Sequence, residues 1–432
     1  MKSHMFKKDN YKGKRLLMLG NNTSSIEILQ VAKKLGVYTI ATDNIYDSPI
    51  KKIADKSYSV STVDIDGLVK LVKSEKIDCI MTGASEFNIE KALTVSEKTG
   101  LPFYIDREQW EIVSNKKRFK DVCKSNNVPV IDEFKLGADF NKNDLENIIY
   151  PVIIKPVDSS GVRGISICNS ENELRIGYKK ALEYSKKKEI LVEKYINGDE
   201  VCIYYTIQDG YISLSAMCDR YFIRQSESIM PLSNIRIFPS RYLDTFIKNN
   251  NKIFQEMFSN LNIKNGLLFV QAFYKNGKLI PIEMGYRLSG MEPQKIIYEI
   301  NGIDPLEMFV RFSLSGEMSG WDLKKIDNPK FNKWACSLWP ILKPGKIKNI
   351  IGLDELKKIH EIIDIVQFYY VDGIINESCI GTLKQALLKL FIVTDTKEML
   401  IGTIKHIQNE LKVIDENNET MLFEFNIDDY SI

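Results

Sequence analysis

The sequence predicts an α/β fold at the start of the chain, followed by an α+β arrangement built on antiparallel strands. Strands and helices alternate from Lys14 onward, short strands joined by Gly, Asn and Asp turns dominate after Tyr150, and more strands with one clear helix begin near Phe331. A chain of 432 residues is too long for one compact core. These changes of pattern predict three parts, with boundaries at 1–112, 113–330 and 331–432.

The first part has the pattern of a doubly wound parallel sheet. Apolar runs predict strands at 15–19, 37–43, 77–83 and 101–105, and amphipathic runs predict helices at 26–36, 65–76 and 87–100. Sheets of this kind bind ligands at the carboxyl ends of their strands. We therefore expect ligand contacts near Gly20–Thr23, Asp43 and Gly83–Glu86.

A dinucleotide site of the Rossmann type is disfavoured. The first strand is followed by Gly20-Asn21-Asn22-Thr23-Ser24-Ser25, which lacks the second and third glycines of the GxGxxG fingerprint. Without those glycines the backbone cannot approach a pyrophosphate closely. Asp43 fits a ribose contact, but a capping or turn aspartate is the commoner reading at such a place.

The rest of the chain is expected to be rich in short strands. The strands are predicted at 151–156, 164–169, 189–196, 199–208, 211–218, 266–275, 278–286, 335–341 and 344–350. Asn276-Gly277 between two of them is a strong signal for a two-residue hairpin. Helices are expected in the stretch 244–260 and at 397–411.

Composition narrows the class of protein. Lys+Arg number 59 and Asp+Glu 57, so no overall basic field favours nucleic acid, and no apolar run has the length of a membrane span. The seven cysteines form no CxxC pair and suit buried thiols in a reducing cytoplasm. Residues 1–5 resemble an expression-vector remnant with Met5 as the expected native start, and no signal peptide is recognisable.

With only His360 and His406 besides His4, histidine chemistry is improbable. Lysines, arginines, carboxylates and backbone groups remain, and these are suited to binding phosphate. Lys155 closes a strand and precedes the small-residue loop 157–164, where an ammonium and closely approaching N–H groups can bind phosphate oxygens. By itself this pattern is more typical of a hairpin with a solvated lysine than of a phosphate site.

Two further groups of residues strengthen the phosphate interpretation. Glu193 and Glu200 flank the turn Asn197-Gly198, where backbone groups can meet an adenine edge and carboxylates can reach ribose hydroxyls. Taken alone, they are as well explained as exposed glutamates at strand ends.

The second group lies on the expected hairpin. Glu283, with Gln271 on the partner strand and Arg287 four residues later, suits Mg²⁺ coordination beside a transferring phosphoryl group, with a surface ion pair as the alternative.

Together and in this order, these motifs make residues from Ser114 to about Gly290 resemble the ATP-grasp domain of biotin carboxylase, D-alanine–D-alanine ligase and the carbamoyl phosphate synthetase large subunit. The resemblance implies a Rossmann-like domain first, a two-part ATP-grasp domain next and a small mixed domain last. It implies ATP contacts from Lys116, Lys155, Ser159, Ser160, Gly161, Gly164, Glu193, Lys194, Ile196 and Glu200. It also implies Glu283 and Gln271 as metal ligands, with Glu283 and Arg287 catalytic.

The sequence departs from the family pattern at two positions of the metal hairpin. The family usually has an acid where this chain has Gln271, and an Asn where it has Gly285. A neutral amide and a missing side chain weaken a site for two Mg²⁺ ions, because Mg²⁺ prefers carboxylate oxygens.

The resemblance implies a cytoplasmic ligase that uses ATP and Mg²⁺ to activate a carboxylate as an acyl phosphate and to transfer it to an amine. Arg163, Arg220 and Arg236 are candidates for holding the acidic substrate, because arginine binds carboxylates bidentately. The alternatives are a carboxylating synthetase of the biotin carboxylase or purine-pathway kind, and an ATP-binding regulatory module without turnover. A homodimer stays open, and neither nucleic acid nor membrane is an expected partner.

Overall fold

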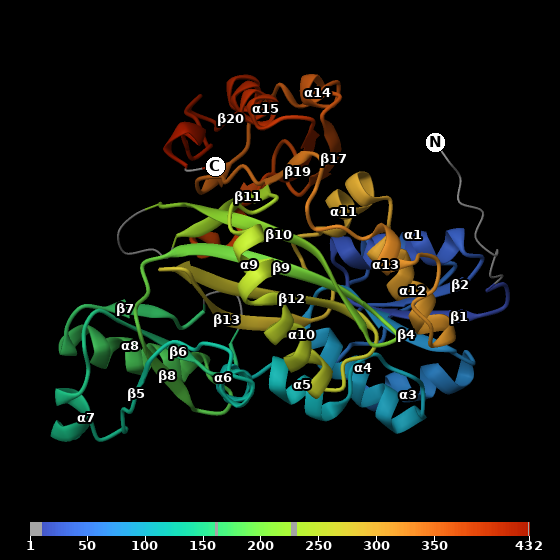
Figure 1. The fold of residues 1–432 in the computed structure, drawn as a ribbon. Coiled ribbons are helices and arrows are strands. Elements are labelled where there is room, and N and C mark those ends of the chain that lie inside the picture. The colour runs from blue at the N-terminus through green and yellow to red at the C-terminus, as the bar shows by residue number, and fades with distance from the viewer. Residues whose placement is uncertain (1–10, 160–162, 226–230, 431) are drawn as a thin grey trace.

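The computed structural model describes residues 11–159, 163–225, 231–430 and 432. Figure 1 shows a large central sheet with the N-terminal part (blue) at one end and a small lobe (teal to green) at the other. The C-terminal part (orange to red) lies above the sheet in this view. Among the described helices, none has the length and apolar character that crossing a bilayer requires.

The N-terminal part is a parallel sheet covered by helices, as its sequence predicts. Its strands lie in the order β3-β2-β1-β4 and all pair in parallel. The strands are β1 (Arg15–Leu19), β2 (Tyr38–Thr42), β3 (Lys56–Tyr58) and β4 (Cys79–Thr82). The helices are α1 (Thr23–Lys34), α2 (Pro49–Ile53), α3 (Ile65–Ser74) and α4 (Glu86–Thr99).

One expectation for this part was wrong, and one strand was not predicted. Residues 101–105 form no strand, because Pro102 cannot donate to a ladder and the segment leaves the sheet instead. Its Tyr104 packs edge-on against Tyr286 and Phe309, which belong to the middle of the chain. The strand that was not predicted is β3, at the edge of the sheet beside β2, whose three residues Lys-Ser-Tyr carry no apolar run that periodicity could detect.

The small lobe is a four-stranded antiparallel sheet in the order β5-β8-β6-β7, with α8 packed on one face. Gly177 lets α8 approach closely, since a Cβ there would meet Ile154 at 2.7 Å. The strands are β5 (Glu133–Phe134), β6 (Val152–Pro156), β7 (Ser166–Cys168) and β8 (Ile190–Lys194). The helices of this stretch are α5 (Arg107–Val113), α6 (Lys116–Ser125), α7 (Lys142–Glu146) and α8 (Glu171–Tyr184).

The central sheet has eight antiparallel strands in the order β13-β12-β9-β10-β11-β14-β19-β17. Strands from the segment after Phe331 therefore extend the sheet built by the middle of the chain. The strands are β9 (Asp199–Gln208), β10 (Tyr211–Ile223), β11 (Leu232–Phe238), β12 (Gly266–Lys275), β13 (Lys278–Tyr286), β14 (Trp334–Leu338), β17 (Ile362–Gln367) and β19 (Leu388–Thr394).

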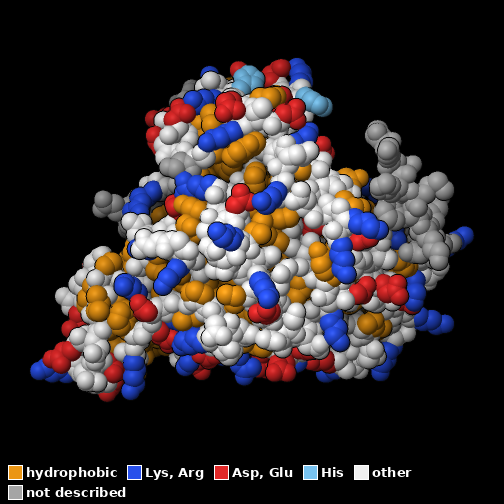
Figure 2. Space-filling model, viewed as in Figure 1, with side chains coloured by type: hydrophobic (Ala, Val, Ile, Leu, Met, Phe, Trp, Pro, Cys, Tyr) orange, Lys and Arg blue, Asp and Glu red, His pale blue; other side chains and the backbone are white. Residues whose placement is uncertain are grey.

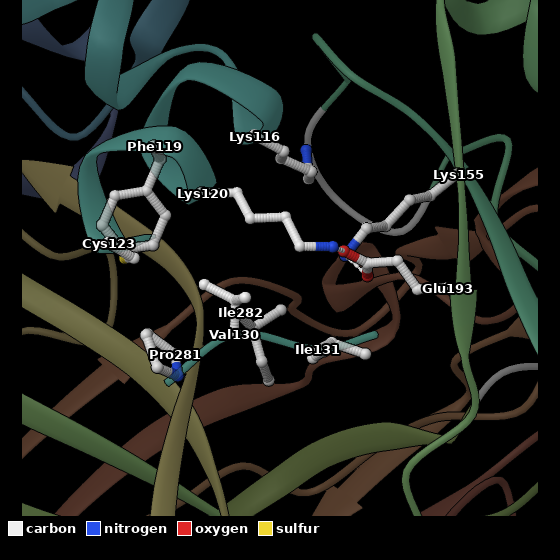
Figure 3. A pocket seen from close by; sticks show the side chains of 10 residues that line it. All are labelled: Lys116, Phe119, Lys120, Cys123, Val130, Ile131, Lys155, Glu193, Pro281 and Ile282. Atoms are coloured by element: carbon white, nitrogen blue, oxygen red, sulfur yellow. Dashed lines mark hydrogen bonds and ion pairs between the residues drawn. The ribbon is translucent and has the colours of Figure 1, made fainter. Parts of the chain in front are cut away.

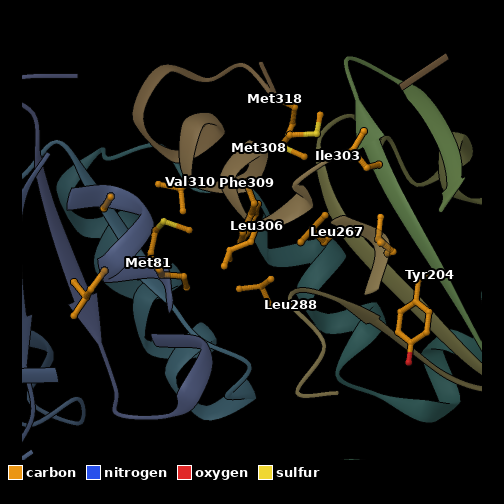
Figure 4. Packing of buried hydrophobic residues seen from close by; sticks show 14 of the residues in the cluster. Met81, Tyr204, Leu267, Leu288, Ile303, Leu306, Met308, Phe309, Val310 and Met318 are labelled. Atoms are coloured by element: carbon orange, nitrogen blue, oxygen red, sulfur yellow. The ribbon is translucent and has the colours of Figure 1, made fainter. Parts of the chain in front are cut away.

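The two faces of this sheet belong to different cores. On β9, Val201, Ile203 and Tyr205 pack toward α9 (Leu243–Asn249) and α10 (Asn251–Asn260). Cys202 and Tyr204 point the other way, into the core shared with the N-terminal part. That core includes Met81 of β4, Leu267 of β12 and Phe309 of α12, and Figure 4 shows Leu306 between Met81 and Leu267. The helices between the sheet and the N-terminal part are α11 (Gln294–Asn301), α12 (Pro305–Ser315) and α13 (Leu323–Ile326).

The remaining C-terminal elements surround the long helix α15 and share a core with β14 and β19. They are β15 (Gly345–Lys346), β16 (Asn349–Ile351), α14 (Leu353–Leu356), β18 (Ile374–Ile375), α15 (Lys397–Glu410) and β20 (Lys412–Ile414), with short 3₁₀ turns at 377–379, 383–385 and 427–429. All seven cysteines are buried free thiols. Figure 2 shows basic and acidic side chains interspersed over the visible face, in keeping with the formal net charge of +2.

Candidate active site

The first turn of α6 carries a lysine toward the loop after β6. Asn115 caps this helix by accepting hydrogen bonds from the backbone N–H groups of Lys117 and Arg118. The ammonium group of Lys116, the next residue, donates to the carbonyl oxygen of Ser159 at 2.5 Å. The helix start and the loop after β6 are therefore joined at the point where the sequence predicts a phosphate site.

A buried carboxylate lies between two ammonium groups beside this contact. Glu193 on β8 pairs with Lys155 of β6 at 2.5 Å and with Lys120 of α6 at 2.7 Å, and its side chain is only 4% exposed. Figure 3 shows the three side chains meeting at the centre of the pocket. These side chains almost fill the pocket and leave about 10 Å³, room for about one water molecule.

Charged neighbours and burial shift the pKa values of two groups in the pocket. Burial alone would raise the pKa of Glu193, but the neighbouring ammonium groups of Lys155 and Lys120 outweigh burial and lower that pKa. Burial and the like charge of Lys155 lower the pKa of Lys116, against the opposing effect of Glu283. The pocket is therefore an ionic cluster with more cations than carboxylates, suited to a polyanion.

Lys120 is a site residue that the sequence interpretation missed. It follows Lys116 by four residues, so both lie on one face of α6, and it is 6% exposed. It also lies 3.3 Å from Glu133 of β5. The i, i+4 spacing from Lys116 on an otherwise apolar helix face was the signal available in the sequence.

The segment after β8 runs between the small lobe and the central sheet. The backbone N–H of Lys194 donates to Asp132 and that of Tyr195 to Pro151, while the Lys194 side chain is exposed. Ile196 lies beside Gly198, where a Cβ would come within 3.1 Å of the Tyr274 carbonyl oxygen. The structure thus directs Glu193 into the pocket and the Lys194 side chain away from it.

The loop after β6 contains four predicted ATP contacts. Ser160 and Gly161 lie outside the described residues. Ser159 contributes the carbonyl oxygen that Lys116 contacts. Gly164 has a φ of +77°, and a Cβ there would lie 2.8 Å from Pro156, so glycine is required where the chain re-enters the lobe. Arg163, exposed beside it, lies at the edge of the loop.

Across the central sheet, one arginine joins two of the predicted site residues. The Nη1 of Arg220 on β10 donates to Glu200 of β9 at 2.6 Å and to the side-chain oxygen of Gln271 on β12 at 2.7 Å. Burial raises the pKa of Glu200, aided by Glu283 and opposed by Arg220. Arg220 is thus fixed on the sheet beside the expected metal hairpin.

The hairpin of β12 and β13 places the two predicted metal ligands opposite each other. Gln271 lies directly opposite Glu283, and a bulge follows between Gln271 and Ala272. Among the described residues, Glu283 has no hydrogen-bond or ion-pair partner, so its carboxylate is available to a cation. The amide oxygen of Gln271 is already occupied by Arg220.

The missing asparagine at Gly285 has a steric explanation. Gly285 lies opposite Phe269, and a Cβ on Gly285 would come within 2.3 Å of that ring. The guanidinium of Arg287 lies over the same ring at 5.0 Å. Phe269 therefore fills the space that a longer side chain would occupy and supports the arginine.

Arg287 also connects the site to the N-terminal part. Its Nη2 donates to Glu86, the first residue of α4, at 3.0 Å, and its Nη1 donates to the carbonyl oxygen of Leu288. Glu86 belongs to the strand-end region Gly83–Glu86 where the sequence predicts ligand contacts. The third predicted substrate arginine, Arg236, is buried on β11, next to Arg220 in the strand register.

Comparison with known proteins agrees with this geometry. Residues 148–294 match the family model of the ATP-grasp domain. The chain carries an ATP-grasp domain. The match includes the loop after β6, Glu193, Glu200 and the hairpin with Glu283, so the ATP-grasp resemblance predicted from the sequence is confirmed.

The curated relatives include formate-dependent phosphoribosylglycinamide formyltransferases. A formate-dependent phosphoribosylglycinamide formyltransferase of Prochlorococcus marinus is 29% identical over 193 residues, 43% of this chain and 48% of the relative. The enzyme of that name from Wolinella succinogenes is 25% identical over 291 residues, 63% of this chain and 70% of the relative. The chain spans about half the length of the first curated relatives that it matches.

Solved structures share the whole architecture. The L-amino acid ligase of Bacillus licheniformis is 19% identical with a TM-score of 0.77 and covers 94% of this chain and 100% of its own. The biotin carboxylase domain of the Hydrogenobacter thermophilus 2-oxoglutarate carboxylase, solved with MgADP, ADP and bicarbonate, is 19% identical with a TM-score of 0.76. It covers 94% of this chain and 91% of its own. At this identity the likeness establishes the fold.

Proposed function

We propose that this protein is an ATP-dependent carboxylate–amine ligase that works through an acyl phosphate. The observation that carries the proposal is the cationic pocket of Lys116, Lys120 and Lys155 around Glu193, which belongs to an ATP-grasp domain. The pocket borders the hairpin that presents Glu283, since Pro281 and Ile282 of that hairpin line it. Nucleotide phosphates and a catalytic carboxylate would therefore meet in one place.

In this mechanism Lys116 and Lys155 bind the phosphates of ATP, and the segment from Glu193 to Ile196 borders the adenine. An oxygen of the substrate carboxylate bonds to the γ-phosphorus as the bond to the leaving ADP oxygen breaks. Arg287 stabilises the charge on the transferring group. The amine nitrogen then attacks the acyl carbon, phosphate leaves, and the nitrogen loses a proton.

The residues also fit a divalent cation. Glu283 offers a carboxylate without a described partner, whereas Gln271 offers an amide oxygen that Arg220 already uses. Bound Mg²⁺ would neutralise phosphate oxygens during transfer. Glu283 is therefore the chief protein ligand we assign to it, and Arg220 adds a fixed positive charge nearby.

A carboxylating or formyl-transferring synthetase is the second candidate. It is favoured by the similarity to the formate-dependent phosphoribosylglycinamide formyltransferases. It is also favoured by the N5-carboxyaminoimidazole ribonucleotide synthetase of Thermotoga maritima, whose structure is similar with a TM-score of 0.70 and 17% identity. That structure covers 93% of this chain and 100% of its own. Formate and bicarbonate are small acids that the same pocket chemistry would activate.

The test is ADP release with a panel of acids, with and without amines and bicarbonate. Turnover that requires both an amino or organic acid and an amine supports the ligase. Turnover that requires bicarbonate or formate with a phosphoribosyl amine supports the second candidate. Tight ATP binding without turnover in any combination would overturn both and indicate a regulatory module.

A further inference from the structure

Beyond the ATP pocket, the same face of the central sheet carries a second group of buried polar side chains. Arg220 on β10 is the register partner of Arg236 on β11, and Arg236 is the partner of Ser337 on β14. Trp339 follows β14 and donates its backbone N–H to the carbonyl oxygen of Asn234. The guanidinium of Arg236 lies 5.2 Å from the Trp339 ring.

Lys389 of β19 completes this group, with its ammonium 4.7 Å from the centroid of the Trp339 ring. The same ammonium donates to the carbonyl oxygen of Gly290 at 2.9 Å and pairs with Glu292 at 2.8 Å. Thr23 at the start of α1 donates to the same Glu292 oxygen at 2.5 Å. The group therefore lies where the central sheet, the loop after β13 and the N-terminal part meet.

Several of these buried atoms lack a hydrogen-bond partner among the described residues. Arg236 is 1% exposed, its Nη2 donates to the carbonyl oxygen of Ser233, and its Nη1 has no partner in the described part of the chain. Asn234 is 1% exposed, and no described residue hydrogen-bonds its side-chain oxygen or nitrogen. Glu292 is fully buried, and its Oε2 is unpaired within the described ranges. Buried polar groups normally have hydrogen-bond partners. Several unpaired polar atoms in one place therefore indicate that a ligand supplies the missing hydrogen bonds.

The charges are also unbalanced. Arg236 and Lys389 are both cationic and buried, while Glu292 is the one carboxylate paired with either of them in the described part of the chain. Burial lowers the pKa of Lys389 and so does the nearby Arg236, against the opposing effect of Glu292. Arg236, Lys389 and Glu292 together carry a formal net charge of about +1.

A purely structural role does not account for Arg236. Its contact with the Trp339 ring is a weak cation–π interaction. Burying a guanidinium without an anionic partner costs much more free energy than such a contact returns. The ring contact is therefore too weak to offset burial, and an anion supplied from outside the protein would offset it.

We infer that Arg236, Asn234 and Lys389 form a subsite that binds a non-reacting carboxylate of the substrate. This inference rests on the proposed ligase function. Arg236 is three strands away from Gln271, about 14 Å at the usual strand spacing, so an anion held there is not the group that attacks ATP. One net positive charge suits a carboxylate better than a phosphate dianion.

The substrate class that follows is an amino acid or a dicarboxylate. Glu292 adds an acceptor for an N–H group at the buried side of the subsite. Phe368 lies 6.2 Å from Trp339 and is 36% exposed, so the group borders the surface on that side. A ligand with a carboxylate at one end and an amine or a second acid at the other would extend from Arg236 toward the phosphoryl-transfer site.

Calorimetry on the full-length protein with L-aspartate, succinate and inorganic phosphate tests the inference. We expect at least one of the two carboxylate probes to bind wild type, and Arg236→Met to weaken that binding tenfold or more. ATP affinity should not change in Arg236→Met, because Arg236 does not line the ATP pocket. The melting temperature should stay the same or rise, since the variant removes a buried charge. Arg175→Met, on the partly exposed face of α8, is the matched control.

Asn234→Leu keeps Arg236 and serves as a second variant, with a tenfold loss expected for the same probe. Equal carboxylate binding by Arg236→Met and wild type would overturn the inference, as would a response to inorganic phosphate alone. No carboxylate binding to wild type would overturn it too. The proposed function fails separately, through absent ATP binding or absent ADP release, because carboxylate binding is measured without ATP.

Discussion

At the scale of single residues, the ATP-grasp pocket is organised around Glu193. Its carboxylate is shared by Lys155 and Lys120, which holds both ammonium groups in place in the described structure. To bind here, a nucleotide phosphate must replace Glu193 as the partner of at least one of these ammonium groups. Because the exchange replaces one buried ion pair by another, it costs less than charging an empty pocket would.

The first prediction concerns Lys155. Lys155→Ala should weaken ATP binding tenfold or more, about 1.4 kcal/mol per factor of ten, because a buried ammonium is lost from the phosphate site. Isothermal titration calorimetry with ATP measures this. Lys180→Ala, exposed on α8 of the same lobe, should bind as wild type. Equal affinity in folded Lys155→Ala and wild type would remove the phosphate role.

The second prediction concerns the metal hairpin. Glu283→Gln should abolish Mn²⁺ binding in the presence of ADP, because it removes the one hairpin carboxylate without a described partner. Gln271→Glu should tighten Mn²⁺ binding, since the new carboxylate faces Glu283 in register. Electron paramagnetic resonance of Mn²⁺ reports both. If Glu283→Gln keeps wild-type Mn²⁺ affinity, the cation is held elsewhere.

Individual site residues were predictable to the extent that they belong to ordered motifs. Lys116, Lys155 and Glu193 do converge on one pocket. The sequence could not reveal that Arg220 ties Glu200 to Gln271, because that contact joins three strands whose pairing is set by the whole sheet. It also could not reveal the clash with the Phe269 ring that explains the glycine two residues after Glu283.

At the scale of elements, the hairpin of β12 and β13 determines which residue Glu283 faces. Its turn residues Asn276 and Gly277 have φ values of +51° and +78°, the left-handed conformation expected of an Asn-Gly hairpin. The turn sets the register as far as the pairing of Ala272 with Pro281. The bulge between Gln271 and Ala272 then shifts the register by one residue, so that Gln271 faces Glu283. The sequence prediction of this hairpin is confirmed because the signal is local.

The third prediction compares two exposed glycines. No atom would contact a Cβ at Gly277 or at Gly402 of α15, so any effect of substitution is conformational. Gly277→Ala should destabilise by roughly 1–2 kcal/mol because its φ is positive. Gly402→Ala should stabilise by up to about 1 kcal/mol because alanine favours a helix interior. Urea denaturation measures both, and a stabilising Gly277→Ala would contradict the turn assignment.

At the scale of the whole molecule, ion pairs join the three parts around the site. Arg287 reaches Glu86 of the N-terminal part, and Lys295 of α11 pairs with both Glu27 of α1 and Asp364 of β17. The sequence predicted the three parts but not these contacts, since nothing local marks residues hundreds of positions apart as neighbours. The same holds for residues 101–105, whose aromatic side chains pack between parts.

The fourth prediction concerns Asp327, which joins α13 to β10 and α11. It accepts hydrogen bonds from Ser215 and Asn301, yet burial raises its pKa to about 6. The folded protein therefore binds this proton more tightly than the unfolded chain, and stability falls as pH rises from about 4 to about 6. Asp327→Asn should remove that loss and stabilise by about 2 to 3 kcal/mol at pH 7.

Urea denaturation at pH 4.5 and pH 7 measures this effect, with Asp121→Asn on the exposed side of α6 as the control. The control should follow wild type at both pH values. A variant at position 327 that loses stability at pH 7 would mean that the ionised carboxylate is favourable in the fold, which is the opposite of the expected sign.

The acyl-phosphate mechanism is tested most directly by following an oxygen atom. A carboxylic acid that supports ADP release is labelled with ¹⁸O in its carboxylate and turned over with ATP and the amine. Attack of that carboxylate on the γ-phosphorus, followed by displacement of phosphate at the acyl carbon, transfers one ¹⁸O to inorganic phosphate. Mass spectrometry should find phosphate with one ¹⁸O for each amide formed. Unlabelled phosphate, or release of AMP and pyrophosphate, would contradict the mechanism.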